Sequence, residues 1–212
     1  LLKDLGKLKE AEIATRKAIE IKPNFAIAHL NLGGILKNLG KFEAAKLSMK
    51  RSIMIQPDFP DAYFNLSLVQ LMTGDYKSGL ENFEYRLIKK KSISIHGNPI
   101  IPMKKDGDFI EGEKILVIGE QAMGDIIIHM RYILLLKRKG VDVKFCTREK
   151  IHSLIKSSGI DQHPLTPEEG NIIKDGKWIP LMSLLKYFEV TPQKPIINTP
   201  YISSEKTLIK KW

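Results

Sequence analysis

The sequence predicts an all-α helical solenoid followed by an α/β domain with a mostly parallel sheet. Two observations lead to this prediction. Residues 1–90 repeat with a period of 34, whereas residues 114–212 alternate short apolar runs with amphipathic segments. A fixed period of this length indicates stacked helical units, and alternating strands and helices indicate a parallel sheet. Residues 91–113, which contain prolines and glycines, are predicted to form a linker between the two.

Glycine turns and prolines mark the repeat period. Gly6-Lys7, Gly40-Lys41 and Gly74-Asp75 stand 34 residues apart, as do Pro23 and Pro57. Each unit is therefore predicted to contain two amphipathic helices that meet at the glycine turn, with a proline after the second helix. Further positions also match after 34 residues: Ala11 with Ala45, Ala28 with Ala62, Asn31 with Asn65, and Leu32 with Leu66.

This period resembles the tetratricopeptide repeat (TPR), a helix–turn–helix unit of 34 residues. The matching motif positions are Leu32, Gly33, Leu36, Ala45 and Pro57 in one unit, and Tyr63, Leu66, Gly79 and Phe83 in the next. Residues 1–25 correspond to the end of one repeat, residues 26–59 to a full repeat, and residues 60–93 to a degenerate last repeat. Stacked repeats bury their faces against neighbours, so we expect further repeats before Leu1.

The resemblance implies a peptide-binding groove lined by the first helix of each pair. Asn31 and Asn65 take equivalent positions on these helices. A carboxamide both donates and accepts hydrogen bonds, so a ladder of asparagines can hold a peptide backbone. The TPR superhelix of the protein O-linked N-acetylglucosamine transferases uses such asparagines, and these two look similar. The alternative is a local hydrogen bond within or between helices, because asparagine is a poor residue for a helix interior.

The second half is organised around residues 114–140. Ile115 to Ile118 form a short apolar run that predicts a buried parallel strand. A loop from Gly119 to Gly124 follows, and then Asp125, a favoured N-cap for a helix that ends at Gly140. Because α/β proteins bind ligands beyond the carboxyl ends of their strands, this loop is the first place to look for a site.

Further elements are expected after this helix. They are a second strand at Val141–Cys146, a helix at Arg148–Ser157, a third strand within Ile160–Leu165, and a helix or loop-plus-helix at Trp178–Phe188. This order of strands and helices is typical of a mostly parallel sheet.

The loop does not match the two common nucleotide-binding motifs. Its glycine spacing differs from the GxGxxG fingerprint, and Thr147 and Arg148 follow the second strand where an acid would hold a ribose. It has the glycine spacing of a P-loop without the Lys-Ser/Thr pair. An NAD enzyme and an NTPase are therefore both disfavoured.

The second half resembles the N-terminal Rossmann-like half of heptosyltransferase-like GT-B glycosyltransferases, in particular bacterial proteins in which TPRs precede that domain. The matching residues are Gly119, Glu120, Gln121, Gly124, Asp125, Arg131 and Tyr132, followed by Pro180–Leu184 and Pro200-Tyr201. The sequence departs from the family at Ala122, where glycine is usual. The resemblance covers nearly the whole chain and implies the acceptor-side half of a sugar-transfer site, with the loop residues Gly119, Glu120, Gln121 and Gly124 at the substrate.

The resemblance also implies a catalytic base. Asp125 would accept a proton from the acceptor hydroxyl, and His129, one turn later, would tune Asp125 or contact the acceptor. The alternatives are a helix cap for Asp125 and a locally bonded histidine for His129. Arg131 is expected to anchor the fold through a carboxylate or a carbonyl.

The predicted reaction uses a nucleotide-sugar donor and a glycan or protein acceptor, with no metal and no other cofactor. GT-B enzymes hold the donor mainly in a C-terminal lobe, which would follow Trp212, so we expect these residues alone not to turn over a nucleotide-sugar. The rival interpretation is a non-catalytic TPR interaction scaffold with a degenerate glycosyltransferase-like domain.

Composition narrows the class of protein further. The net charge is +10, but lysines alternate with acids along the predicted helices, which indicates a solvated surface rather than a nucleic-acid site. Cys146 is the single cysteine, so an internal disulfide or a CxxC metal site is impossible and a reducing cytoplasm fits. The longest apolar stretch, Ile126–Leu136, is too short to span a bilayer, and no signal peptide is visible.

Overall fold

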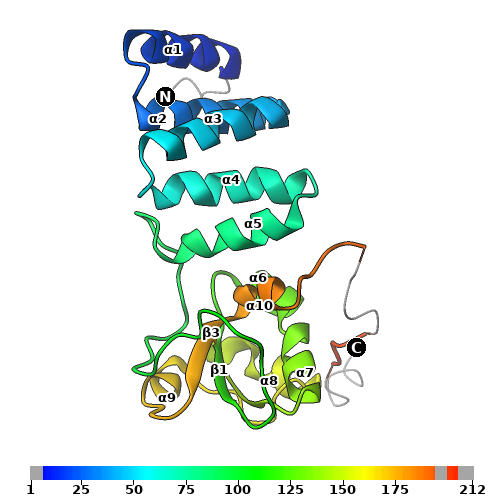
Figure 1. Cartoon of the computed structure of the whole chain (residues 1–212). Helices are drawn as coiled ribbons and strands as arrows, with labels where there is room; N and C mark the ends of the chain where they lie inside the picture. The colour runs from blue at the N-terminus through cyan, green and yellow to red at the C-terminus, as the bar shows by residue number, and fades with distance from the viewer. Residues whose placement is uncertain (1–6, 194–199, 205–212) are drawn as a thin grey trace. The chain divides into compact units, whose positions relative to one another are not determined.

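The computed structural model describes residues 7–193 and 200–204. The chain divides into two compact units, Leu1–Ser92 and Ile93–Trp212 (Figure 1). The first unit is helical and the second contains a parallel sheet, as the sequence predicts.

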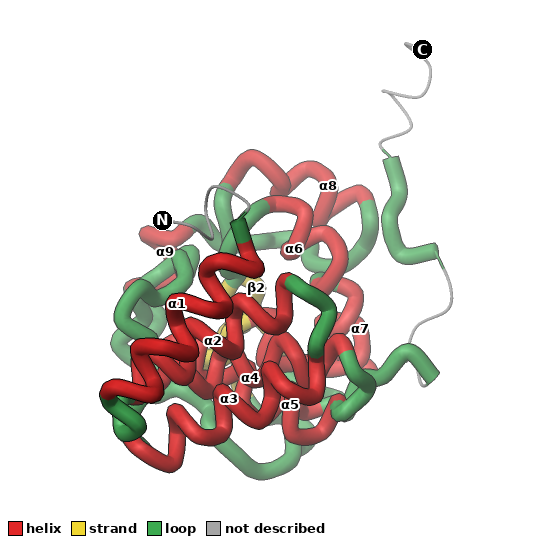
Figure 2. Tube along the Cα trace, turned by 90° about the horizontal axis from the view of Figure 1, so that it is seen from above, coloured by secondary structure: helices red, strands yellow, loops and turns green. Residues whose placement is uncertain are grey.

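Two antiparallel helix pairs and one preceding helix form the described part of the helical unit (Figure 1; Figure 2, red). Its elements are α1 (Leu8–Ile21), α2 (Ala26–Asn38), α3 (Phe42–Ile55), α4 (Pro60–Met72), α5 (Tyr76–Phe83) and the 3-10 helix η1 (Glu84–Leu87). The pairs α2/α3 and α4/α5 turn at Gly40 and Gly74, whose φ angles of +73° and +86° favour glycine. Gly6, the equivalent turn residue of the first repeat, lies outside the described residues.

Small residues let the paired helices approach closely. A Cβ atom on Gly33 of α2 would lie 2.6 Å from Cγ of Met49 on α3. A Cβ atom on Gly79 of α5 would lie 2.8 Å from Cδ2 of Leu71 on α4. The buried core between the helices consists of Leu32, Leu36, Ala45, Met49, Leu66 and Val69. The repeat motif is therefore a set of packing positions.

The last repeat departs from this pattern in its second helix. Helix α5 has 8 residues, against 14 in α3, and continues as η1. Arg86, which stands where a small residue is usual, is fully buried. Its Nη1 donates to the carbonyl oxygen of Phe83 at 3.2 Å and to Oε1 of Glu84 at 2.6 Å. A buried guanidinium needs such acceptors, and the tighter 3-10 turn brings them within reach.

The second unit contains a three-stranded parallel sheet. Its strands are β1 (Lys114–Ile118), β2 (Asp142–Cys146) and β3 (Lys177–Pro180), in the order β2-β1-β3. Strand β1 pairs in parallel with both neighbours, and its last residue, Ile118, lies opposite Cys146 and Pro180. The central strand is therefore the one whose apolar run the sequence singles out.

Both faces of β1 are covered, as is usual for parallel strands. Ile115 and Val117 face the larger core, which takes in residues of the helices that follow β1 and β2. Leu116 and Ile118 face a second core that includes Ile101. The helical elements of this unit are α6 (Met123–His129), α7 (Arg131–Arg138), η2 (Glu149–Ile151), α8 (His152–Ser157), α9 (Pro167–Asn171), η3 (Leu181–Ser183) and α10 (Leu184–Tyr187).

The predicted third strand within Ile160–Leu165 is wrong. Only Leu165 pairs with the edge of β2, donating to the carbonyl oxygen of Phe145 at 2.7 Å. The backbone N–H of Phe145 donates to Oδ2 of Asp161 at 3.1 Å. A side chain therefore takes the place of a backbone partner at this edge of the sheet. The third strand is instead β3, at the start of the segment predicted as a helix or loop-plus-helix. Pro180 is tolerated because it ends a short strand.

Residues 91–113 were predicted to be a linker, but from Ile93 onwards this segment packs within the second unit. Ile95 forms an antiparallel bridge with Glu120, and Met103 forms a parallel bridge with Trp178. The buried Lys104 donates from Nζ to Oε1 of Glu113 at 3.0 Å. The prolines and glycines of this segment correctly indicate an irregular path, but its backbone partners are distant in sequence and leave no local pattern.

Candidate functional site

Helices α2 and α4, the first of each pair, present equivalent residues at their surfaces. Ile27 is 50% exposed, and Asn31, one turn later, is exposed as well. Asp61 and Asn65 take the same positions on α4, 34 residues later, and are half-buried. Because α2 and α4 are neighbours in the fold, these four residues define one surface, which we call the asparagine face.

The two asparagines differ in how their carboxamides are used. The Nδ2 atom of Asn65 donates to the carbonyl oxygen of Asp61 at 2.8 Å, one turn back in α4. Asn31 makes no side-chain hydrogen bond to any residue that the structure describes. Local bonding, one of the two alternatives from the sequence, therefore applies to one of the two N–H donors of Asn65. The donor and the acceptor of Asn31 are both open to a ligand.

The chain after η1 folds back on the α4 end of the asparagine face. The backbone N–H of Lys90 donates to Oδ2 of Asp61 at 3.1 Å, and the Lys89 ammonium lies 5.1 Å from the centre of the Phe64 ring. These contacts partly cover α4, so the α2 end of the face, with Ile27 and Asn31, is the more accessible one.

In the second unit, the loop after β1 lies at the carboxyl edge of the sheet. Gly119 packs so closely that a Cβ atom would lie 2.7 Å from Oγ1 of Thr147. Glu120 is fully buried, and its Oε1 accepts a hydrogen bond from the backbone N–H of Met182 at 2.8 Å. This bond joins the loop after β1 to η3, the 3-10 helix that directly follows β3. The connection from β1 leads to β2 on one side of β1, and the chain later returns to β3 on its other side. The loop after β1 and η3 therefore flank the topological switch point, where α/β proteins bind ligands.

Gln121 is held in a left-handed backbone conformation, with φ of 61°. Such a φ is uncommon for a residue other than glycine and persists where the surroundings impose it. The N–H of Gln121 donates to the carbonyl oxygen of Ser94 at 2.8 Å. Its own carbonyl oxygen accepts from Nε2 of His96 at 3.0 Å. The segment around residues 94–96 thus fixes the shape of the loop.

Asp125 is not the N-cap that the sequence predicts. Helix α6 begins at Met123, with Ala122 as its N-cap, so Asp125 is the third helical residue. Its Oδ2 accepts from the N–H of Ala122 at 3.3 Å. A carboxylate three residues into a helix reaches back to the N-cap N–H in this way. Asp125 is only half-buried, and a Cβ atom on the neighbouring Gly124 would point into open space, so this end of the loop is accessible to a ligand.

His129 bonds to the backbone of Asp125 rather than to its carboxylate. Its Nδ1 lies 2.7 Å from the Asp125 carbonyl oxygen, which can only accept, so Nδ1 carries the hydrogen. Burial lowers the pKa of His129 below its ordinary value, so the ring is neutral at neutral pH. This is the locally bonded histidine that the sequence leaves open as an alternative.

Three buried polar residues that the sequence analysis does not select lie beside the loop: His96, Thr147 and His152. The hydroxyl of Thr147 lies 3.2 Å from Nδ1 of His96, and Nε2 of His152 lies 3.0 Å from the Thr147 carbonyl oxygen. Since Nε2 of His96 donates to Gln121, its Nδ1 accepts from the Thr147 hydroxyl. Burial lowers the pKa of His96. A lone histidine in an irregular segment carries no sequence signal for this role.

Arg131 anchors the fold through a carbonyl, as predicted. Its Nε donates to the carbonyl oxygen of Ile128 at 2.7 Å, and its guanidinium lies over the Tyr201 ring. The Tyr201 hydroxyl donates to the Ile127 carbonyl oxygen at 2.8 Å. Both acceptors lie where α6 gives way to α7, so these side chains satisfy backbone groups at the junction.

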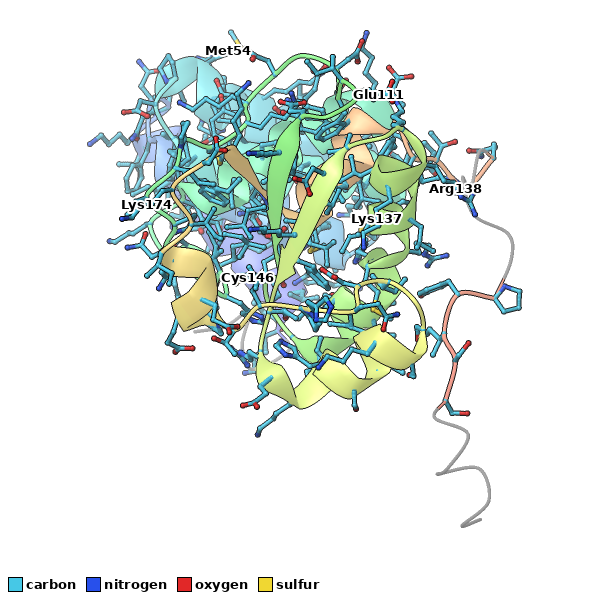
Figure 3. The ribbon with its side chains drawn as sticks, turned by 90° about the horizontal axis from the view of Figure 1, so that it is seen from below. Met54, Glu111, Lys137, Arg138, Cys146 and Lys174 are labelled. Atoms are coloured by element: carbon cyan, nitrogen blue, oxygen red, sulfur yellow. The ribbon has the colours of Figure 1, made fainter. Side chains whose placement is uncertain are left out.

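Two cavities of this unit lie away from the loop. They have volumes of about 330 and 630 Å³ and lie around the amino ends of the strands. Lys174 lines the first and Glu111 the second, both labelled in Figure 3, whereas neither cavity is lined by residues 119–125. Position relative to the strands therefore singles out the candidate site, because parallel sheets bind ligands at their carboxyl ends.

Other site types receive no support from the described residues. Within residues 7–193 and 200–204, no group of three or more histidines, cysteines, aspartates or glutamates is placed to hold a metal ion. Cys146 is buried, and burial raises the pKa of its thiol to about 11, so it is no nucleophile. No helix in the described part of the chain is long and apolar enough to cross a membrane.

Comparison with known families identifies residues 1–25 and 26–59 as tetratricopeptide repeats. These are the boundaries predicted for the first two repeats, so the helical unit contains TPRs. A comparison with curated proteins gave no match. The resemblance of residues 114–212 to glycosyltransferases stays a prediction.

Three solved structures are similar to part of the chain. They are the TPR2B domain–pHsp70 complex of yeast Sti1 (24% identity, TM-score 0.39, covering 40% of this chain and 67% of that one), the TPR2AB domain–pHSP90 complex of yeast Sti1 (24%, 0.38, 40% and 33%), and MamA (19%, 0.39, 42% and 52%). The chain thus spans between 33% and 67% of the length of these structures.

Proposed function

We propose that the helical unit binds an extended segment of a partner protein on the asparagine face. The observation that carries this proposal is the exposed Asn31, whose carboxamide has no partner among the described residues and stands one turn after the exposed Ile27. Asparagine offers a donor and an acceptor to a peptide unit, and Ile27 offers apolar contact to a side chain. Asn65 contributes its acceptor and one N–H, because its other N–H is used within α4.

The test is a binding titration with a fluorescein-labelled peptide selected from a displayed random library on the wild-type protein. We expect Asn31→Ala to weaken binding about fivefold to tenfold, the contribution of one or two hydrogen bonds. The matched control is Asn24→Ala, which removes an exposed carboxamide from the turn between α1 and α2. Equal affinity of Asn31→Ala and Asn24→Ala would contradict the proposal.

We also propose that the second unit supplies the acceptor side of a sugar-transfer site in a longer protein. The supporting observation is the loop at the switch point, where Glu120 ties the loop after β1 to η3 and Asp125 is left half-exposed. In this reaction, the Asp125 carboxylate accepts the proton of the acceptor hydroxyl while that oxygen bonds to the anomeric carbon. The bond from this carbon to the nucleoside diphosphate breaks at the same time.

The rival to this second role is a scaffold in which the α/β unit has no catalytic activity. The two are separated by measuring nucleoside diphosphate release by the longer protein from a panel of nucleotide-sugars. We expect Asp125→Asn to lower transfer about 100-fold or more while peptide binding by the helical unit is unchanged. His129→Gln is the comparison variant, and we expect a smaller loss because His129 bonds to the backbone. Absence of transfer by the wild type supports the scaffold. A cytoplasmic location stays a prediction for either role.

A further inference from the structure

Residues of the three consecutive helices α1, α2 and α3 line a groove with a volume of about 480 Å³. Its apolar lining comes from all three helices: Ile19 of α1, Leu32 of α2 and Leu47 of α3. Asn31 is not among its lining residues, so this surface, which we call the outer groove, is distinct from the asparagine face.

The α3 side of the outer groove exposes an apolar residue together with a cation. Leu47 is 72% exposed, and Arg51 follows it one turn later on the same side of α3. The same pairing occurs one repeat earlier, in Ile13, which is 69% exposed, and Lys17. An isolated exposed leucine needs no explanation, but the same aliphatic–cation pair in two successive repeats is a patterned surface.

The outer groove is lined by charges of both signs. Two arginines and one glutamate, Arg16, Arg51 and Glu20, line it. Arg16 is already paired with Glu12 at 2.9 Å, and Glu12 also pairs with Lys41 at 2.9 Å. Arg51, by contrast, makes no hydrogen bond or ion pair with any described residue. On α3, the Arg51 guanidinium is therefore available beside an apolar surface, and the Glu20 carboxylate lines the groove from α1.

We infer that the outer groove binds a segment of a partner protein in which an apolar side chain stands next to an acidic one. The apolar side chain inserts between Ile19, Leu32 and Leu47. The carboxylate pairs with Arg51, whose planar guanidinium can donate two parallel hydrogen bonds to it. Since the pair lies at an open surface, binding weakens as salt concentration rises. This second docking surface is independent of the proposed peptide site on α2 and α4.

The experiment uses the full chain and a short fluorescein-labelled peptide in which leucines alternate with aspartates, followed by fluorescence anisotropy. We expect Arg51→Glu to weaken binding about tenfold, because attraction becomes repulsion, and Leu47→Ser to weaken it about fivefold through lost apolar contact. Lys50→Glu is the matched control: it makes the same charge change on the adjacent residue, which is also exposed and does not line the groove. Circular dichroism spectra confirm that each variant is folded.

Two further measurements show whether the acidic peptide binds the outer groove or the asparagine face. Asn31→Ala is expected to bind this peptide like the wild type, so failure of the asparagine-face proposal does not affect this test. A peptide with lysines in place of the aspartates is expected not to bind. The inference is overturned if the wild type does not bind the acidic peptide, if Arg51→Glu and Lys50→Glu weaken binding equally, or if Asn31→Ala abolishes binding.

Discussion

The two units of this chain reach their structures by different kinds of contact. In the helical unit, Gly33 of α2 meets Met49 of α3, and Gly79 of α5 meets Leu71 of α4, so close contacts occur within each helix pair. In the α/β unit, the decisive contacts join distant segments, as when His96 holds Gln121 and Thr147. Local contacts that repeat with a fixed period can be predicted from a sequence, whereas a single contact between distant segments cannot. The predictions below test this difference.

The largest expected effect on stability comes from breaking the buried ion pair between Lys104 and Glu113, which lies within residues 93–113. In Lys104→Met, the Glu113 carboxylate loses its main partner, although Lys177 remains 3.5 Å away. Removing one member of a buried pair costs roughly 3–5 kcal/mol of unfolding free energy. Urea unfolding followed by Trp178 fluorescence in a Trp212→Phe background measures this loss. The control is Lys114→Met, which breaks the exposed Lys114–Asp175 pair and should change little. Equal effects would mean that residues 93–113 are a linker after all.

Alanine substitutions at two glycines, one in each unit, compare how much a turn in each unit contributes to stability. Gly176, with φ of +97°, precedes β3, and a Cβ atom there would lie 2.5 Å from the backbone oxygen of Lys114. Gly74, with φ of +86°, has open space around it. We expect Gly176→Ala to lower stability by roughly 2–4 kcal/mol, from strain plus the clash, and Gly74→Ala by about 1 kcal/mol, from strain alone. Thermal unfolding measures both, and a larger loss for Gly74→Ala would contradict the packing described.

The smallest effect is a pH dependence confined to the α/β unit. Burial lowers the pKa of His96 below its ordinary 6.5. The unfolded chain therefore takes up a proton before the folded one does. Stability is full above pH 6.5 and falls as the pH drops from there towards the folded pKa. We expect His96→Gln to reduce this dependence of the unfolding free energy on pH, measured by urea titrations followed by Trp178 fluorescence. The remaining pH dependence comes from His129, whose pKa is also lowered by burial. An unchanged slope would argue against a buried neutral His96.

The sequence predicts the helical unit and the first two strands well, for identifiable reasons. Equivalent positions such as Ala45 and Gly79 reappear after 34 residues because each repeat packs in the same way. The run Ile115–Ile118 is apolar throughout because both faces of β1 are buried. Strand β3 was not predicted, because it has only four residues and ends in proline, and both features favour a turn.

The candidate sites were only partly predictable. The loop at residues 119–125 is found from its position after an apolar run, but what holds it in place is not. Glu120 is fully buried and bonds to Met182, 62 residues away, and His96 bonds to Thr147, 51 residues away. Separations of this size leave no periodic trace in one sequence. Asn31 and Asn65 look equivalent in sequence, and only the structure shows that Asn65 already uses one of its two N–H donors.

The most direct test of the central claim, that α2 presents Asn31 to a peptide, is two-dimensional NMR of the asparagine side-chain NH2 groups during titration with a peptide selected on the wild-type protein. We predict a large shift for the NH2 signal of Asn31, a smaller one for Asn65, whose NH2 is bonded to Asp61 in the free protein, and none for Asn24. A saturating titration in which the Asn31 signal stays in place would contradict this account.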